Sequence, residues 1–378
     1  MKQMLEELGV KPVINACGTV TVLGGCLMDD EVLQAMREAA KVYVDMTELH
    51  TKAGAYVANL AGAEAAYISA GAAAGLALSI AACMTRGQTE LMTKLPFTES
   101  MRNEVIVQKL HRNMYDYNLE IAGARIIEIG TEQKTTPRDL EDAIGKKTAA
   151  VAFFSYEPQI GVLSLAQVIE IAHKNQIPVI VDAAAELPPK DNLTKFISMK
   201  ADLVLFSGGK DIGAPNDTGI ILGRRDLITT CMRLGPHSYE TVNSKRRVYF
   251  GRPMKTCKED ILGVVVALRR YLKADPAERI LESERKVHYM ISELSDHAGV
   301  AVRSFEPGPT HNRPPCFPRV ELEFKNTQWS AEKVAEELKK CDPPIYAYVM
   351  NERLYLNPQC LREGEEKIVV SSLKKLLS

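Results

Sequence analysis

The chain has 378 residues, of which 46% are hydrophobic and 25% are charged. This length and composition are typical of a globular protein with a large core and room for two domains. With 47 basic and 48 acidic residues the net charge is −1, so the chain as a whole has no electrostatic preference for nucleic acid or an anionic membrane.

The cysteines and the N-terminal sequence indicate a cytoplasmic protein. The eight cysteines include no C-x-x-C pair and no His/Cys cluster at zinc spacing, so we expect reduced thiols and no metal site. The first residues, MKQMLEELGVKPVINACGT, carry charges throughout and lack the apolar core of a signal peptide. The most apolar segment, 70–84, is too short to span a bilayer.

Helical and strand-like patterns alternate from about residue 53 to residue 223. The helix over 136–145 has Thr136 as candidate N-cap, Pro137 at the first helical position and Gly145 at its end. The other expected helices are 52–64, 70–84 and 164–176. The expected strands are 65–69, 103–109, the end of 121–130, 147–155, 177–185, 201–207 and 218–228. Apolar strands separated by helices predict a mostly parallel sheet covered on both faces.

The rest of the chain predicts a second, smaller domain. A basic stretch with Gly and Pro, 237–260, interrupts the alternation. The later expected elements are two long helices, 259–275 and 276–299, and then strand, helix, strand and helix over 318–326, 330–341, 345–358 and 365–378. We therefore predict an N-terminal segment (1–20), a large α/β domain (21–264) and a small α+β domain (265–378).

A phosphate site is expected where the strand 65–69 runs into a helix of small residues. The sequence there is ISAGAAAG, from Ile68 to Gly75. Free backbone N–H groups and the helix dipole attract an anion at such a corner. The sequence matches neither G-x-x-x-x-G-K-[ST] nor G-x-G-x-x-G, so a nucleotide site is not supported. A tightly packed Ala-rich helix is the alternative explanation.

Three polar side chains also follow predicted strands, where ligands bind in open α/β sheets. Asp182 ends an apolar strand and suits a protonated ring nitrogen, unless it caps the next helix. Lys210 follows two glycines and suits a nucleophilic amine, unless it is solvated. His111 suits stacking or acid–base chemistry, unless it is structural. Together with the phosphate corner, these are the parts of a pyridoxal-phosphate site.

Several longer stretches resemble one branch of the fold-type I pyridoxal-phosphate enzymes. The branch contains selenocysteine synthase, the seryl-tRNA selenium transferase, and D-glucosaminate-6-phosphate ammonia-lyase. The stretches are VINACGTVTVLGGCLM, LAGAEAAYISAGAAAGLAL, IPVIVDAAAELPP, FSGGKDIGAPNDTGIILGRRDLI and YFGRPMKTCKEDILGVVVAL. The resemblance implies a mostly parallel seven-stranded sheet with helices on both faces, a smaller C-terminal α+β domain, and pyridoxal 5′-phosphate as cofactor.

The resemblance also implies roles for individual residues. Lys210 would form the Schiff base with the cofactor, Asp182 would pair with its ring nitrogen, and His111 would stack on its ring. The phosphate would be held by Ala70, Gly71, Ala72 and Ser207. In the GRPMK stretch, Arg252 and Lys255 are candidate contacts to the substrate or a neighbouring subunit, so a homodimer or higher homo-oligomer is implied.

Two departures from the family pattern bear on the substrate. Gln359 stands where relatives often have an arginine that could hold a carboxylate, and Arg353 or Arg362 would have to replace it. The segment after the lysine, DIGAPNDTG, differs from the Arg-Gly-Pro-Gln pattern of many relatives.

The resemblance implies a lyase that eliminates water and ammonia from an amino sugar acid such as D-glucosaminate 6-phosphate, giving a 2-keto-3-deoxy acid. The alternatives are a seryl-tRNA selenium transferase, another pyridoxal-phosphate enzyme (aminotransferase, racemase or aldolase), or a binding module without catalysis. A tRNA partner is not expected, because the net charge is nearly neutral. The acid for hydroxyl departure is open among His111, Tyr115, Tyr117 and Glu186.

Overall fold

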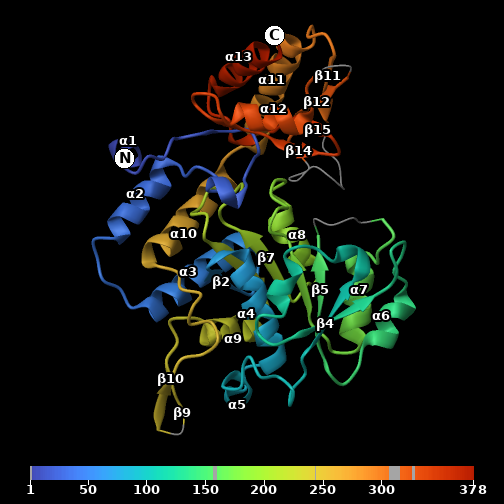
Figure 1. Ribbon diagram of the computed structural model, residues 1–378. Coiled ribbons are helices and arrows are strands. Elements are labelled where there is room, and N and C mark those ends of the chain that lie inside the picture. The colour runs from blue at the N-terminus through green and yellow to red at the C-terminus, as the bar shows by residue number, and fades with distance from the viewer. Residues whose placement is uncertain (1, 156–159, 243, 306–315, 326–327) are drawn as a thin grey trace. The chain divides into compact units, whose positions relative to one another are not determined.

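The computed structural model describes residues 2–155, 160–242, 244–305, 316–325 and 328–378 (Figure 1). The chain divides into two compact units, a larger one over Met28–Ala274 and a smaller one made of Met1–Leu27 and Asp275–Ser378. The boundary predicted after residue 264 falls inside helix α10 (Lys258–Lys273), which belongs to the larger unit. The roles of the units as cofactor-binding and small domains stay a proposal.

The larger unit contains the seven-stranded, mostly parallel sheet that the sequence predicts. Its order is β2 (Ala65–Ser69), β8 (Gly219–Gly223), β7 (Leu203–Ser207), β6 (Val179–Asp182), β5 (Thr148–Phe154), β3 (Glu104–Gln108) and β4 (Arg125–Ile129). Strand β8 is antiparallel to both its neighbours, and the other neighbouring pairs are parallel. The strand predicted over 218–228 ends early, because helix α9 begins at Arg225.

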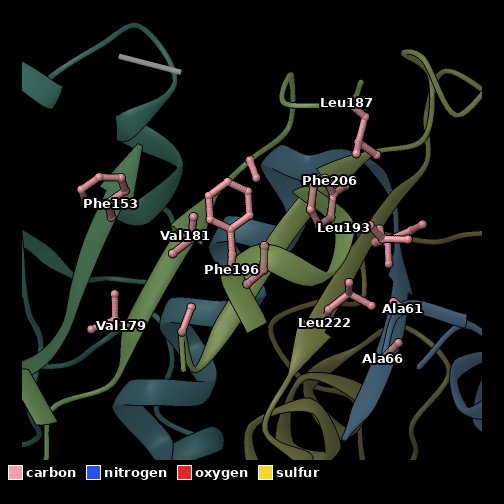
Figure 2. Close-up of a cluster of buried hydrophobic side chains, with 14 of the residues drawn as sticks. Ala61, Ala66, Phe153, Val179, Val181, Leu187, Leu193, Phe196, Phe206 and Leu222 are labelled. Carbon is pink, nitrogen blue, oxygen red and sulfur yellow. The ribbon is translucent and has the colours of Figure 1, made fainter. Parts of the chain in front are cut away.

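Side chains alternate between the two faces of this sheet, and helices cover both. In β7, Val204 and Phe206 belong to one core cluster and Leu203 and Leu205 to the other. The first face packs against α3 (Met46–Ala61), α6 (Pro137–Ala143), α7 (Leu165–Lys174), α8 (Asn192–Ser198) and α10, and Figure 2 shows part of this core. The second packs against α4 (Gly71–Thr85), α5 (Thr89–Met92) and α9 (Arg225–Leu234).

Local sequence signals fix where several of these helices begin. Thr136 caps α6 in a capping box with Asp139, and Pro137 is its first residue, as predicted. Ser164 caps α7 in the same way with Gln167. Helix α2 (Asp30–Ala39), which packs against α10, was not predicted.

A hairpin in the larger unit falls in the stretch that the sequence marked only as a basic interruption. Its strands are β9 (Glu240–Val242) and β10 (Lys245–Arg247), and it projects away from the sheet (Figure 1). Arg233 fixes its base, with Nε 2.7 Å and Nη2 2.9 Å from the two carboxylate oxygens of Glu240.

The smaller unit is built on a four-stranded antiparallel sheet with three longer helices. The sheet order is β11 (Val300–Phe305), β12 (Arg319–Phe324), β15 (Arg353–Leu356) and β14 (Tyr348–Met350). The helices are α11 (Pro276–Leu294), α12 (Ala331–Leu338) and α13 (Glu365–Leu377), with a short α1 (Lys2–Glu7). Strand β1 (Ile14–Asn15) pairs in parallel with β13 (Ile345–Tyr346), which joins the N-terminal segment to this unit. Within the described ranges, no helix of either unit combines the length and apolar character needed to cross a bilayer.

Candidate active site

The predicted cofactor-binding residues lie at or just after the ends of strands that meet at one edge of the sheet. Asp182 lies opposite Leu205 of β7 and Phe154 of β5, while Ser69 and Ser207 both lie opposite Gly219 of β8. The carboxyl ends of β2, β5, β6 and β7 therefore meet at this edge, where α/β sheets bind ligands.

The turn between β2 and α4 has the geometry of an anion site. Ala70 has φ −77° and ψ 71°, Gly71 has φ +83°, and Ala70 has no side chain that could cap the 15-residue helix. The Ser69 hydroxyl donates to the Gly71 carbonyl at 2.9 Å. A Cβ on Gly219 would lie 2.6 Å from the Gly71 carbonyl carbon and 2.7 Å from the Ala72 nitrogen, so this glycine lets β8 approach the turn. The first backbone N–H groups of α4 can thus face an anion.

Asp182 is a buried carboxylate at the end of β6. The residue is 4% exposed, and Oδ1 accepts a hydrogen bond from the Ala184 N–H at 2.9 Å. Burial raises the pKa of Asp182 to about 6, against the Ala184 hydrogen bond and the charge of Lys210. Its backbone is fixed as well, because the N–H and the hydroxyl of Ser155 both donate to its carbonyl. A cationic partner would keep this carboxylate ionised.

Lys210 lies in the loop that connects the antiparallel strands β7 and β8. The loop is closed by hydrogen bonds from the Gly208 N–H to the Thr218 carbonyl (2.8 Å) and from the Gly213 N–H to the Lys210 carbonyl (3.1 Å). Burial lowers the pKa of the Lys210 amine, while the charges of Asp182 and Glu186 oppose that shift. An amine of lowered pKa can be either a nucleophile or a base.

His111 ends the short 3₁₀ turn Lys109–His111 that follows β3. Its side chain is fully buried, and its ring packs edge-to-face on Phe153 with a centroid distance of 4.7 Å. The side chain of Asn113 donates to the His111 carbonyl at 2.8 Å, which fixes the backbone of the turn.

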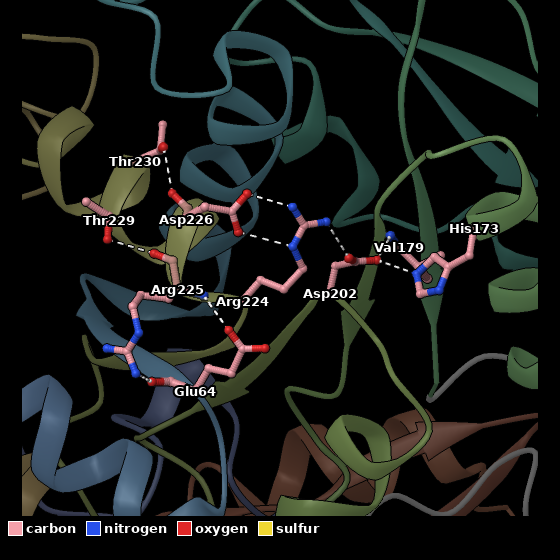
Figure 3. Close-up of polar contacts among 9 residues, drawn as sticks. All are labelled: Glu64, His173, Val179, Asp202, Arg224, Arg225, Asp226, Thr229 and Thr230. Atoms are coloured by element: carbon pink, nitrogen blue, oxygen red, sulfur yellow. Dashed lines mark hydrogen bonds and ion pairs between the residues drawn. The ribbon is translucent and has the colours of Figure 1, made fainter.

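Asp202 is a second buried aspartate, and it differs from Asp182 because its carboxylate has several partners within the protein. It precedes β7, at the opposite edge of the sheet from Asp182, and Figure 3 shows its neighbours. Its oxygens accept from the Val179 N–H at 2.7 Å and from Arg224 Nη1 at 2.8 Å, and His173 Nε2 lies 2.8 Å away. These partners satisfy Asp202 within the fold.

The remaining predicted residues lie in other places. Arg252 and Lys255 are in the loop before α10, close enough to His237 to lower its pKa further after burial. Arg353 is in the smaller unit, where its guanidinium lies 3.3 Å from Glu321. Also in the smaller unit, Arg362 pairs with Glu365 at 2.6 Å, and Gln359 follows the cap residue Asn357, whose Oδ1 accepts from its N–H.

Sequence reasoning missed the part that Gly219 plays at the phosphate corner. A glycine in an apolar strand signals a close approach of another backbone, but the sequence does not tell which backbone approaches. The structure identifies it as Gly71 and Ala72.

The groups on this edge match the chemistry that pyridoxal phosphate requires. A helix N-terminus suits a phosphate, a buried carboxylate suits a protonated pyridine nitrogen, and an amine of lowered pKa suits an aldehyde. The residues that are present therefore fit the cofactor.

Comparison with known proteins agrees with this fit. The SelA family model, described as L-seryl-tRNA selenium transferase, matches residues 13–362. D-glucosaminate-6-phosphate ammonia lyase of Salmonella typhimurium (strain 14028s / SGSC 2262) is 31% identical over 389 residues, which cover 98% of this chain and 97% of that protein. 5′-C-glycyluridine monooxygenase-decarboxylase of Streptomyces sp is 31% identical over 386 residues, covering 98% and 91%.

Solved structures of related enzymes are also similar to this chain. The structure of D-glucosaminate-6-phosphate ammonia-lyase is similar with a TM-score of 0.84 at 29% identity, covering 99% of this chain and 98% of that one. Aspartate aminotransferase from Thermotoga maritima shares the fold with a TM-score of 0.56 at 14% identity, covering 99% and 94%. The chain therefore belongs to the SelA family and has the fold-type I fold of enzymes that use pyridoxal phosphate.

Proposed function

We propose that the protein is a pyridoxal-phosphate-dependent ammonia-lyase. Its substrate would be an amino sugar acid such as D-glucosaminate 6-phosphate, and its products ammonia and a 2-keto-3-deoxy acid. The observation that carries the proposal is that Asp182 ends β6 and Lys210 follows the parallel strand β7 at the same carboxyl edge of the sheet, where burial lowers the pKa of the Lys210 amine. The 31% identity to an ammonia lyase over nearly the full length of both chains supports the choice of reaction.

In this proposal the predicted residues hold the cofactor. Ala70, Gly71 and Ala72 at the start of α4 would bind its phosphate together with Ser207, and Asp182 would pair with its ring nitrogen. His111 would face the ring, and Lys210 would hold the aldehyde carbon. When bound, pyridoxal phosphate withdraws electrons from the α-carbon of an attached amino acid, so that the α-proton becomes acidic.

Lys210 would be the base of the reaction. Burial lowers the pKa of its amine, so a larger fraction is neutral at a given pH than for an exposed lysine. A neutral amine can take the α-proton, and the electron pair left on the α-carbon then forms the double bond as the β-hydroxyl leaves. Asp182 would support this step by keeping its negative charge next to the ring nitrogen.

The substrate phosphate needs cations, and the region before α10 supplies them. Arg252 and Lys255 lie in this loop, and Arg247 is exposed at the end of β10. We propose that these residues contact the phosphate of a substrate bound in a neighbouring subunit, which requires a homodimer or a higher homo-oligomer. A cytoplasmic location is part of the same proposal.

Release of ammonia tests the proposed reaction. Purified protein loaded with pyridoxal phosphate is mixed with D-glucosaminate 6-phosphate, with D-glucosaminate and with 2-amino-3-hydroxy acids, and ammonia and 2-keto acid are measured. We expect equal amounts of both products from the phosphorylated sugar acid, and a loss of about 10³-fold or more in K210A. Amino-group exchange with pyruvate-type acceptors without ammonia release would refute the lyase assignment in favour of an aminotransferase.

The family match favours one second candidate, a transferase acting on seryl-tRNA. A gel shift with seryl-tRNA at low salt distinguishes the two candidates. Because phosphate contacts dominate such complexes, a tRNA-binding enzyme would shift the tRNA strongly at low salt. We expect no shift.

A further inference from the structure

The loop of residues 251–256 carries the two cations proposed to contact the substrate phosphate, and we call it the basic loop. Both its ends are anchored on the segment at the end of α9. At its start, the Gly251 N–H donates to the carbonyl of Leu234, the last residue of α9, at 2.9 Å. At its end, the Thr256 carbonyl lies 3.0 Å from Nε2 of His237. Because a carbonyl oxygen only accepts hydrogen bonds, His237 donates this one and holds the end of the loop.

A second imidazole contacts the same threonine from another helix. Thr256 is 3% exposed, and its hydroxyl lies 3.3 Å from Nε2 of His50, a buried residue of α3. The ring of His50 stacks on Tyr67 of β2, and the ring of His237 lies 5.0 Å away. The two histidines therefore hold Thr256 through both of its side-chain and carbonyl oxygens.

Between its anchors the basic loop is folded by short-range hydrogen bonds. The Arg252 N–H donates to the Tyr249 carbonyl at 3.0 Å, and the Met254 N–H donates to the Gly251 carbonyl at 2.9 Å. The two cations are separated by only two residues, and like charges repel each other. The ends of the loop must therefore be held if both cations are to face one anion.

Both imidazoles are neutral at neutral pH, which suits them to this contact. Burial lowers the pKa of His237, and the cations of the basic loop lower it further against the hydrogen bond to the Thr256 carbonyl. Burial lowers the pKa of His50 to about 4. Among the described residues Nδ1 of His50 has no hydrogen-bond partner, which is costly for a buried nitrogen. An apolar ring would pack as well without this cost, so the contact with Thr256 explains the imidazole.

We propose that His50 and His237 are positioning residues for the binding of the substrate phosphate. Through the hydroxyl and the carbonyl of Thr256, they hold the basic loop so that its two cations face the same anion. The inference rests on the proposed function, which supplies the phosphate. Neither histidine contacts the substrate in this account, so loss of either anchor should weaken substrate binding and leave the chemical step intact.

Paired substitutions separate the two anchors from packing. H237F keeps an aromatic ring beside His50 but removes the donor to the Thr256 carbonyl, whereas H237Q keeps an N–H donor. T256V removes the hydroxyl at nearly constant shape, whereas T256S keeps it. H288Q replaces an exposed histidine of α11 and serves as the matched control.

Cleavage by trypsin reports the position of the loop without any need for activity. Trypsin cuts after Lys and Arg but not before Pro, so the Lys255–Thr256 bond is the one cut in the basic loop, because Pro253 follows Arg252. In the folded holoenzyme we expect this cut to be about fivefold or more faster in H237F and in T256V than in wild type, since each loses one hydrogen bond that holds the buried Thr256. H237Q, T256S and H288Q should stay within about twofold of wild type, as measured by mass spectrometry of the fragments.

The kinetics of ammonia release from D-glucosaminate 6-phosphate connect the loop to the substrate. We expect H237F and T256V to raise KM by about fivefold or more with kcat changed by less than about threefold, because the loop acts on binding and not on the chemical step. H237Q, T256S and H288Q should keep KM within about twofold of wild type.

Two results overturn the proposal. Wild-type cleavage rates after Lys255 in H237F and T256V reject the anchoring of the loop, and faster cleavage with an unchanged KM rejects its link to the phosphate. If H237F does not fold, T256V decides. A wild-type protein that releases no ammonia contradicts the proposed function, and the cleavage rates then still decide whether the two histidines hold the basic loop.

Discussion

His50 is a buried imidazole that makes the stability of the protein depend on pH. The residue is 3% exposed, its ring stacks on Tyr67 at a centroid distance of 4.9 Å, and the ring of His237 lies 5.0 Å away. Burial, and secondly the charge of His237, lower the pKa of His50 from 6.5 to about 4. Between these two values the unfolded chain binds more protons than the folded one, so stability falls as the pH falls through this window.

The size of the effect follows from the pKa difference. The step from 6.5 to about 4 corresponds to about 3.4 kcal/mol, of which about 2.5 kcal/mol is lost between about pH 7.5 and about pH 4.5. Urea unfolding of the cofactor-free protein at these two pH values measures it. Between these two pH values, the free energy of unfolding of H50Q should fall by about 2.5 kcal/mol less than that of the wild type.

The comparison between pH values removes the direct effect of the substitution. H50Q also loses the stacking on Tyr67, but this loss is present at both pH values. H288Q, which replaces an exposed histidine, serves as the matched control and should keep the wild-type dependence on pH. Equal losses in wild type and H50Q would refute the assignment of a depressed pKa to His50.

D182N should lower kcat by about 10²–10³-fold while the cofactor stays attached, because the ring nitrogen loses its anionic partner. Absorbance spectra measure cofactor attachment, and ammonia release measures kcat. A wild-type kcat would contradict the role assigned to Asp182. G219A should weaken the affinity for pyridoxal phosphate by about 5- to 150-fold, because its Cβ would meet the backbone of Gly71 and Ala72 at a cost of about 1–3 kcal/mol. G145A, whose Cβ would meet nothing within 4 Å, should bind the cofactor like wild type in the same fluorescence titration, and equal affinities in both variants would reject the close approach.

The large sheet could be predicted because its signals are local. The apolar stretches predicted as strands over 177–185 and 201–207 contain the buried strands β6 and β7. The capping residue Thr136 marks its helix without help from the rest of the chain. Since parallel strands end at a common edge, the sequence also indicated that Asp182 and Lys210 follow strands at the same edge of the sheet, and β6 and β7 are parallel neighbours in the structure.

Features that depend on distant partners could not be read from the sequence. Strand β1 has two residues, and its pairing with Ile345–Tyr346 leaves no periodic pattern. Strand β11 was missed because Val300–Phe305 has only partial alternation of buried and exposed side chains. The ion pair between Arg233 and Glu240 at the base of the β9–β10 hairpin likewise could not be predicted from the sequence.

Attachment of the cofactor to one lysine is the most direct test of the account. The purified protein is incubated with pyridoxal phosphate, reduced with borohydride, digested and analysed by mass spectrometry. We expect absorbance at about 420 nm that disappears on reduction, with the mass of the reduced cofactor on the peptide that carries Lys210 and none in K210A. Cofactor mass on another lysine, or no mass at all, would contradict the assignment of this edge of the sheet as the active site.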